Sequence, residues 1–153
     1  MKTKTIALTI SLVFVSVALG FQDNPQMGTW KLNEAKSKFA GKARNNTVVY
    51  EAAGDQIKVT VDGVDENGAA VHNEWTGKFD GKEYPVTGDA SSETRSYRMI
   101  DKHTLALTAM KGGKQTLTGR IVVSADGKTR TVTTTSTDAQ GKKVTNVVVY
   151  DKQ

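Results

Sequence analysis

The chain has 153 residues, with 21 Lys and Arg against 16 Asp and Glu, and it contains no cysteine. Its basic residues are interspersed with acidic ones rather than gathered in runs, so we expect no nucleic-acid partner. Because disulfides are excluded, a single domain of this length must be stabilised by its hydrophobic core alone.

The first twenty residues have the pattern of a secretory signal peptide. Lys2 and Lys4 precede an apolar run over 6–19, and the run ends on small residues. It is too short for a comfortable membrane span. We therefore predict cleavage after Gly20, a mature domain over 21–153, a periplasmic or secreted location and no stable membrane insertion once the leader is removed. The domain lacks the cysteine that a bacterial lipoprotein needs after its leader, which favours a soluble protein.

Short alternating runs of apolar and polar residues, separated by turns rich in Gly and Asp, follow Gln26. This pattern is typical of antiparallel hairpins. One short helix is expected over 33–39, capped by Asn33. About ten strands are predicted, over 28–32, 46–53, 56–64, 69–79, 82–87, 94–100, 104–110, 114–124, 128–137 and 142–151. We predict an all-β fold in which this up-and-down meander closes into a barrel, because closure removes the unpaired edges of the sheet.

Loop lengths predict which residues share a face of the sheet, because side chains alternate along a strand. A three-residue loop over 111–113 pairs Leu107 with Leu117, and the register of the last hairpin places Tyr150 outside. The predicted inner face is apolar and consists of Val48, Tyr50, Ile57, Val59, Val61, Trp75, Tyr84, Val86, Tyr97, Met99, Leu105, Leu107, Leu117, Ile121, Val123, Val132, Val147 and Val149.

The segment Gly28-Thr29-Trp30-Lys31-Leu32 opens the first predicted strand. A Gly-x-Trp at the start of an antiparallel meander resembles the calycin superfamily, and these five residues are especially similar to the start of its fatty-acid-binding branch. The resemblance implies that Trp30 has a structural role at the closed end of a barrel, beside an arginine from a late strand. Arg130 is the candidate for that arginine.

The sequence departs from the fatty-acid-binding branch at two places. Residues 33–45 are too few for the two-helix lid, and the last strand has Val148-Val149-Tyr150 where the branch has Arg-x-Tyr. The second departure argues against a fatty acid as the ligand. The predicted export agrees with lipocalins proper, so the chain most resembles a bacterial lipocalin-like domain.

We predict that the barrel binds an apolar or amphipathic small molecule in its interior. The predicted ligand-binding residues are Tyr50, Trp75, Tyr84, Arg95, Tyr97 and Arg130. Two alternatives stay open. Arg130 could instead stack on Trp30 and cap backbone carbonyls, with Arg95 exposed at the rim. The aromatic residues could instead fill the barrel, which would then act through its surface as a protein-binding or structural envelope module, and the Thr-rich outer face of 129–137 motivates that alternative.

The sequence contains no recognisable catalytic or metal-binding motif. Residues 63–74 partly match the ligand spacing of a calcium loop, but Gly63 stands at its first ligand position, so a hairpin turn explains them better. His72 and His103 have no partner at a metal-binding spacing. We expect no catalytic residue, no cofactor and no metal, and we expect a monomer.

Overall fold

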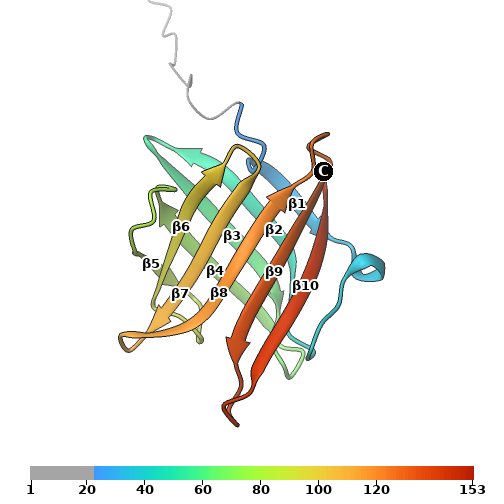
Figure 1. Ribbon diagram of the computed structural model, residues 1–153, viewed down its shortest axis with the longest axis vertical. Coiled ribbons are helices and arrows are strands. Elements are labelled where there is room, and N and C mark those ends of the chain that lie inside the picture. Colours follow the sequence, from blue (N-terminus) through green and yellow to red (C-terminus); the bar gives the residue numbers. More distant parts are fainter. Residues whose placement is uncertain (1–22) are drawn as a thin grey trace, which may run out of the picture.

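The computed structural model describes residues 23–153, so the predicted leader and its cleavage site lie outside the described residues. Ten antiparallel strands follow one another around a barrel, which the pairing of β1 with β10 closes (Figure 1). The predicted meander and its closure are confirmed. The strands are β1 (Gly28–Leu32), β2 (Arg44–Ala53), β3 (Gln56–Val64), β4 (Ala70–Gly77), β5 (Tyr84–Thr87), β6 (Thr94–Asp101), β7 (Thr104–Lys111), β8 (Lys114–Val123), β9 (Thr129–Thr137) and β10 (Lys143–Lys152).

The predicted helix over 33–39 is a single 3-10 turn, η1 (Glu34–Lys36). Asn33 caps it as expected, because its side-chain oxygen accepts the Lys36 N–H at 3.2 Å. No helix within residues 23–153 is long and apolar enough to cross a membrane.

The two ends of the barrel differ. One end, which we call the closed end, carries residues 23–27 and the C-terminus and lies at the top of Figure 1. Gln26 is 1% exposed there, and its side-chain amide donates to the backbone oxygen of His103 at 3.0 Å. The other end, the open end, carries the segment 33–43 and the loop 88–93.

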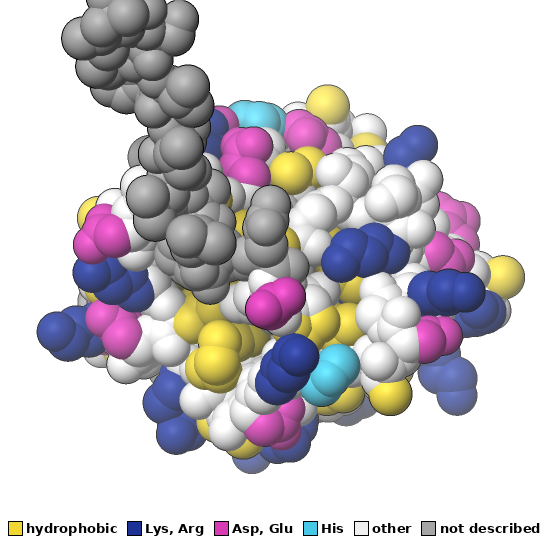
Figure 2. Space-filling view, turned by 90° about the horizontal axis from the view of Figure 1, so that it is seen from above, with side chains coloured by type: hydrophobic (Ala, Val, Ile, Leu, Met, Phe, Trp, Pro, Cys, Tyr) yellow, Lys and Arg dark blue, Asp and Glu magenta, His cyan; other side chains and the backbone are white. Residues whose placement is uncertain are grey.

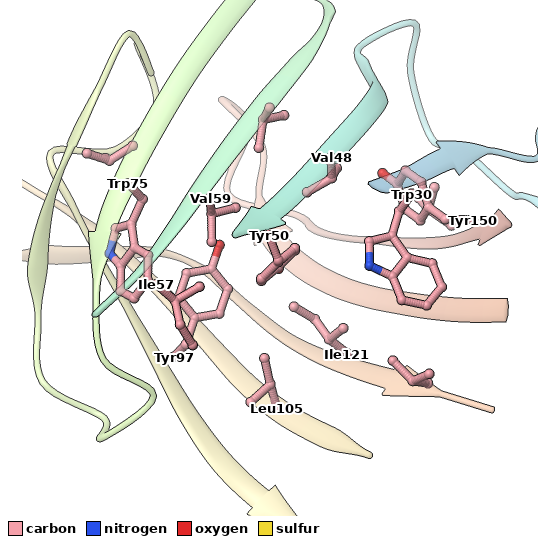
Figure 3. Packing of buried hydrophobic residues seen from close by; sticks show 14 residues of the cluster. Trp30, Val48, Tyr50, Ile57, Val59, Trp75, Tyr97, Leu105, Ile121 and Tyr150 are labelled. Carbon is pink, nitrogen blue, oxygen red and sulfur yellow. The ribbon is translucent and has the colours of Figure 1, made fainter. Parts of the chain in front are cut away.

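The core consists of inward side chains from nearly every strand (Figure 3). Trp75 anchors an aromatic cluster, with ring centroids 4.7 Å from Tyr97 and 5.7 Å from Tyr84. Trp30 and Tyr150 lie together in a second group, on the other side of the view in Figure 3. The buried hydrophobic residues are Trp30, Val48, Tyr50, Ile57, Val59, Val61, Trp75, Val86, Tyr97, Leu105, Ala109, Ile121, Val123, Val148 and Tyr150.

The last hairpin corrects the predicted face of β10. Thr137 pairs with Lys143, so the loop has five residues, 138–142, rather than the four expected. A change of one residue moves every side chain of a strand to the other face. Tyr150 is therefore inside and 3% exposed, and Val148 is inside with it. The predicted inward positions of Val147 and Val149 are wrong for the same reason.

Two further details of the predicted register are wrong. Leu107 pairs with Gly119 rather than Leu117, because the turn at 112–113 has two residues and β8 carries a bulge just after it. Both leucines still face inward. Met99 is 45% exposed because it lines an open hollow at the closed end.

Candidate functional site

The interior of the barrel holds a cavity of about 440 Å³ that is bounded at the open end by the loops 65–69 and 88–93. This volume falls within the range of small-molecule sites. Its wall is mostly apolar and includes Val48, Val61, Leu107, Leu117, Ile121, Val132 and Val148.

Arg130 lies deep in this cavity and is 3% exposed. Strand alternation turns it inward on β9, where it pairs with Tyr150 on β10 and Val123 on β8. Its guanidinium carbon lies 4.6 Å from the ring centroid of Tyr50, 5.5 Å from that of Tyr150 and 5.8 Å from that of Trp30. Three aromatic faces therefore surround one cation.

The hydrogen bonds of Arg130 are incomplete. Its Nη2 donates to the hydroxyl of Tyr50 at 2.9 Å, while Nε and Nη1 have no partner within residues 23–153. A buried cation normally has an anionic partner, because removing it from water costs several kcal/mol. Within the same residues Arg130 forms no salt bridge, so the cavity contains a positive charge with unused donors.

The neighbouring tyrosines do not neutralise this charge. Burial raises the pKa of Tyr50 well above its ordinary value, and the charge of Arg130 only partly opposes that effect. Burial likewise raises the pKa of Tyr150 to about 12. Both side chains therefore stay protonated near neutral pH, and the counter-charge has to come from elsewhere.

Arg95 also lines the cavity, but its charge is paired with the carboxylate of Asp89. The Asp89 side chain additionally accepts hydrogen bonds from the Ser91 N–H at 2.8 Å and from the Ser92 hydroxyl. Burial alone would raise the pKa of Asp89, but the bonds from Ser91, Ser92 and Arg95 outweigh it and lower the pKa to about 2. The Arg95 side chain is only 13% exposed, so the alternative of a rim-exposed arginine is wrong.

The four predicted aromatic residues divide into two groups. Tyr50 and Tyr97 line the cavity, whereas Trp75 and Tyr84 are not among its lining residues. The indole of Trp75 donates to the backbone oxygen of Arg95 at 3.0 Å, and the hydroxyl of Tyr84 donates to Asp80 at 2.9 Å. These two side chains pack the wall next to the cavity.

Trp30 occupies the place expected of a structural residue. It is fully buried near the closed end, and its indole N–H donates to the backbone oxygen of Gln26 at 2.9 Å. Arg130 stacks near it, as the calycin resemblance implies. Within the described part of the chain, the Arg130 guanidinium donates to the Tyr50 hydroxyl and not to a backbone carbonyl.

The sequence reasoning missed several inward residues, among them Tyr150 and Asn73. Tyr150 was placed outside because of the loop-length error, yet its pairing with Arg130 puts a tyrosine and an arginine side by side in the cavity. Asn73 is inward on β4 and 7% exposed. The alternation that turns Trp75 inward also turns Asn73 inward, and that signal could have found it.

The polar groups outside the barrel form ordinary surface contacts. On the outer face of β3 and β4, His72 contacts Asp62 at 2.6 Å and Glu74 at 3.6 Å, and all three are well exposed. The Asp65 side chain accepts two backbone N–H groups of its own loop, so the predicted hairpin turn is confirmed. Residues 23–153 contain no group of three side chains placed to hold a metal ion.

A second, wider hollow of about 830 Å³ lies at the closed end and is open to solvent. Ile57, Phe79, Met99 and Ile100 contribute its apolar lining. Figure 2 views the molecule from this end and shows hydrophobic side chains among charged ones. The six predicted binding residues are all absent from its lining.

Comparison with known proteins assigns this chain to no family. No protein-family model matches the sequence. No curated protein matches it either. Among solved structures, the chain is similar to a redesigned beta barrel, mFAP1, bound to DFHBI, with a TM-score of 0.45 and 12% identity over 85% of this chain and 97% of that one. The calycin resemblance therefore stays a prediction.

Proposed function

We propose that this domain binds an amphipathic small molecule inside the barrel and holds its anionic group with Arg130. The observation that carries the proposal is a buried guanidinium with two unpartnered nitrogens in a cavity of about 440 Å³. A carboxylate would supply the missing negative charge and an acceptor for the unpartnered donors, through a charge-assisted hydrogen bond. The protonated hydroxyl of Tyr50, which already accepts from Arg130, can donate to the same anion.

The charges around the cavity favour a ligand that binds with its anionic end deep in the barrel. At the open end the cavity is lined by the carboxylates of Asp65 and Glu66. The cavity-lining Arg44 and Arg95 are each paired with a carboxylate. Among the described residues that line the cavity, Arg130 is the arginine without such a partner, and it lies deep in the barrel. The apolar body of the ligand would then lie against the aliphatic wall, toward the open end.

The proposal is tested with retinoic acid and retinol, a matched acid and alcohol, titrated against the intrinsic tryptophan fluorescence. In the Arg130→Met variant we expect the affinity for the acid to fall by roughly ten- to a hundredfold, the value of a hydrogen bond to a charged group, and the affinity for the alcohol to stay unchanged. Methionine retains much of the side-chain volume and packs well against aromatic rings.

Arg120→Met is the control, because Arg120 is exposed on the outer face of β8. It should bind both retinoids as the unmodified protein does. Equal affinity of the Arg130→Met variant and the unmodified protein for the acid would refute the role of Arg130. Failure of the protein to bind either retinoid, a fatty acid or an anionic hydrophobic dye would refute the function.

The alternative of a filled barrel acting through its surface is less well supported. A solid interior would leave no cavity of about 440 Å³. The Thr-rich outer face of β9 is present as predicted, but the hydrogen bond that Thr135 forms there, with Thr145 at 3.3 Å, lies within the sheet itself.

We also propose that binding occurs without chemistry. The titratable groups deep in the cavity are an arginine and tyrosines of raised pKa, which are poor general bases near neutral pH. Ligand recovered unchanged after prolonged incubation, as judged by mass spectrometry, is the expected result.

Export of the domain is part of the same proposal. The leader pattern supports a site of action outside the cytoplasm. N-terminal sequencing of the protein recovered from the envelope fraction of a bacterial host should begin at Phe21. Full-length protein confined to the cytoplasm would count against it.

A further inference from the structure

We propose that the ligand carries a hydroxyl group along its body, and that Asn73 binds this hydroxyl. The inference rests on the proposed function and deepens it by naming a second polar group on the ligand. Asn73 is 7% exposed and lines the same cavity as Arg130. Its side-chain oxygen has no hydrogen-bond partner in the described part of the chain.

A buried amide whose oxygen has no partner is unfavourable in the ligand-free protein. Leaving a buried acceptor unsatisfied costs about 1–3 kcal/mol. On one side of Asn73, the paired residue on β3 is Val61, and Val61 pairs in turn with Val48 on β2, so this side offers no side-chain donor. A polar residue at an inward position of a mostly apolar cavity is what a binding site uses to fix the orientation of a ligand.

The register of the sheet places Asn73 between the anionic group of the ligand and the open end. Tyr50, which holds Arg130, pairs with Val59, and Val59 pairs with Trp75. Asn73 is the next inward residue of β4 toward the open end, roughly 7 Å along the strand. The polar group that it binds therefore lies part-way along the ligand body and not at either end.

A hydroxyl is the group that fits this amide best. The side chain of asparagine offers an acceptor oxygen and a donor nitrogen, and its neighbours do not fix which of the two faces the ligand. A hydroxyl both donates and accepts, so it satisfies either orientation. A ligand with only methylene groups at this level would leave the amide unpaired, and the site would discriminate against it.

The test uses dodecanoic acid and the series of its isomers that carry one hydroxyl at successive carbons, titrated by calorimetry. We expect affinity to depend on the position of the hydroxyl, with an optimum at mid-chain where binding is at least tenfold tighter than for dodecanoic acid. In the Asn73→Leu variant, whose side chain has a similar shape, this optimum should vanish while dodecanoic acid binds with unchanged or higher affinity. Asn73→Val serves as a second variant in case the first does not fold.

Thr134→Val is the matched control, because Thr134 also lines the cavity but is only half-buried. It should retain the mid-chain optimum. A flat profile across the isomers, together with Arg130-dependent binding of dodecanoic acid, would overturn this inference and leave the proposed function standing. An optimum that persists in the Asn73 variants would also overturn it. Absence of binding by every acid would overturn both.

Discussion

Arg130 and Asp89 are two charged side chains that differ in how completely their hydrogen bonds are satisfied. Nε and Nη1 of Arg130 have no partner in the described chain, whereas the Asp89 carboxylate is bonded by Ser91, Ser92 and Arg95. An unsatisfied buried group is destabilising, and a satisfied one is not. The unpartnered Arg130 is what we expect of a ligand-free binding site. The fully bonded Asp89 is what we expect of a residue that anchors the loop 88–93.

The Asp89 anchor gives a prediction for the effect of pH on stability. The pKa of this carboxyl is about 2 in the folded protein and near its ordinary value when unfolded. Because the pKa is lower in the folded protein than in the unfolded chain, the ionised Asp89 carboxylate stabilises the fold. Its contribution to the free energy of unfolding is fully present above about pH 4 and is lost as the pH falls toward 2. The stability difference between the unmodified protein and Asp89→Asn should be about 2 kcal/mol near neutral pH and shrink below pH 4.

Urea unfolding at a series of pH values measures this difference. Glu51→Gln, at an exposed position of β2, is the control and should differ little from the unmodified protein. A difference for Asp89→Asn that stays constant from pH 7 to pH 2 would show that the carboxylate is not the anchor.

Inward charged residues could be predicted from the sequence, but their partners could not. Arg95 and Arg130 lie in phase with the apolar positions of their strands, so alternation alone places them inside. Whether each has a counter-ion depends on how a loop folds, and Asp89 reaches Arg95 only because the loop 88–93 turns back over the open end. Asn73 obeys the same alternation, and the sequence pattern places it as firmly as it places Arg130.

At the scale of the elements, strands were easier to predict than the loops that set their register. Strand positions follow from alternation and from Gly and Asp in the turns, and they were confirmed for all ten strands. The last hairpin failed because Asp138 bonds the backbone N–H groups of both Gln140 and Lys142, which closes a five-residue loop. Four and five residues both suit such a turn, yet they place Tyr150 on opposite faces.

The loop 88–93 depends on a glycine at its first position. Gly88 has φ +77°, and a Cβ atom there would lie 2.1 Å from the backbone oxygen of His72. Gly127 has a similar φ of +72° with no atom within 4 Å of that point. Gly88→Ala should therefore lower the free energy of unfolding by more than Gly127→Ala, for which backbone strain alone costs about 1–2 kcal/mol.

This pair of variants separates steric contact from backbone strain. Thermal unfolding measures the two losses, and hydrogen exchange of residues 88–93 should show faster opening only in Gly88→Ala. Equal losses in the two variants would mean that the loop shifts away from His72 without penalty and does not need a glycine for close approach.

At the scale of the whole molecule, the barrel interior is packed around Trp30 near the closed end and hollow toward the open end. The closed end contains Trp30 and the buried side chain of Gln26, while the cavity extends from Arg130 to the loops of the open end. A strand count of ten fixes the width of a barrel, but the size and direction of inward side chains decide how much of it is filled. That is why the sequence left a filled and a hollow interior as equal alternatives.

Closure of the barrel depends on its last residues. β1 is paired on one side by Tyr150, Asp151 and Lys152, and the N–H of Gln153 donates to the oxygen of Thr29 at 3.0 Å. Truncation after Val149 removes the partner strand of β1, exposes the backbone groups of its edge and takes away one of the rings around Arg130. We expect the truncated protein to lose cooperative unfolding and to self-associate, because an open sheet edge is free to pair with another chain.

Size-exclusion chromatography and near-ultraviolet circular dichroism report these two changes. Removal of Gln153 alone is the control, since it leaves every β1–β10 residue pair in place and should preserve a monodisperse, cooperatively folded protein. The truncated chain could instead stay monodisperse and keep the near-ultraviolet signal of its buried tryptophans. That result would mean that the other nine strand pairings maintain the fold without the β1–β10 pairing, and that Trp30 is fixed by Gln26 rather than by the closure.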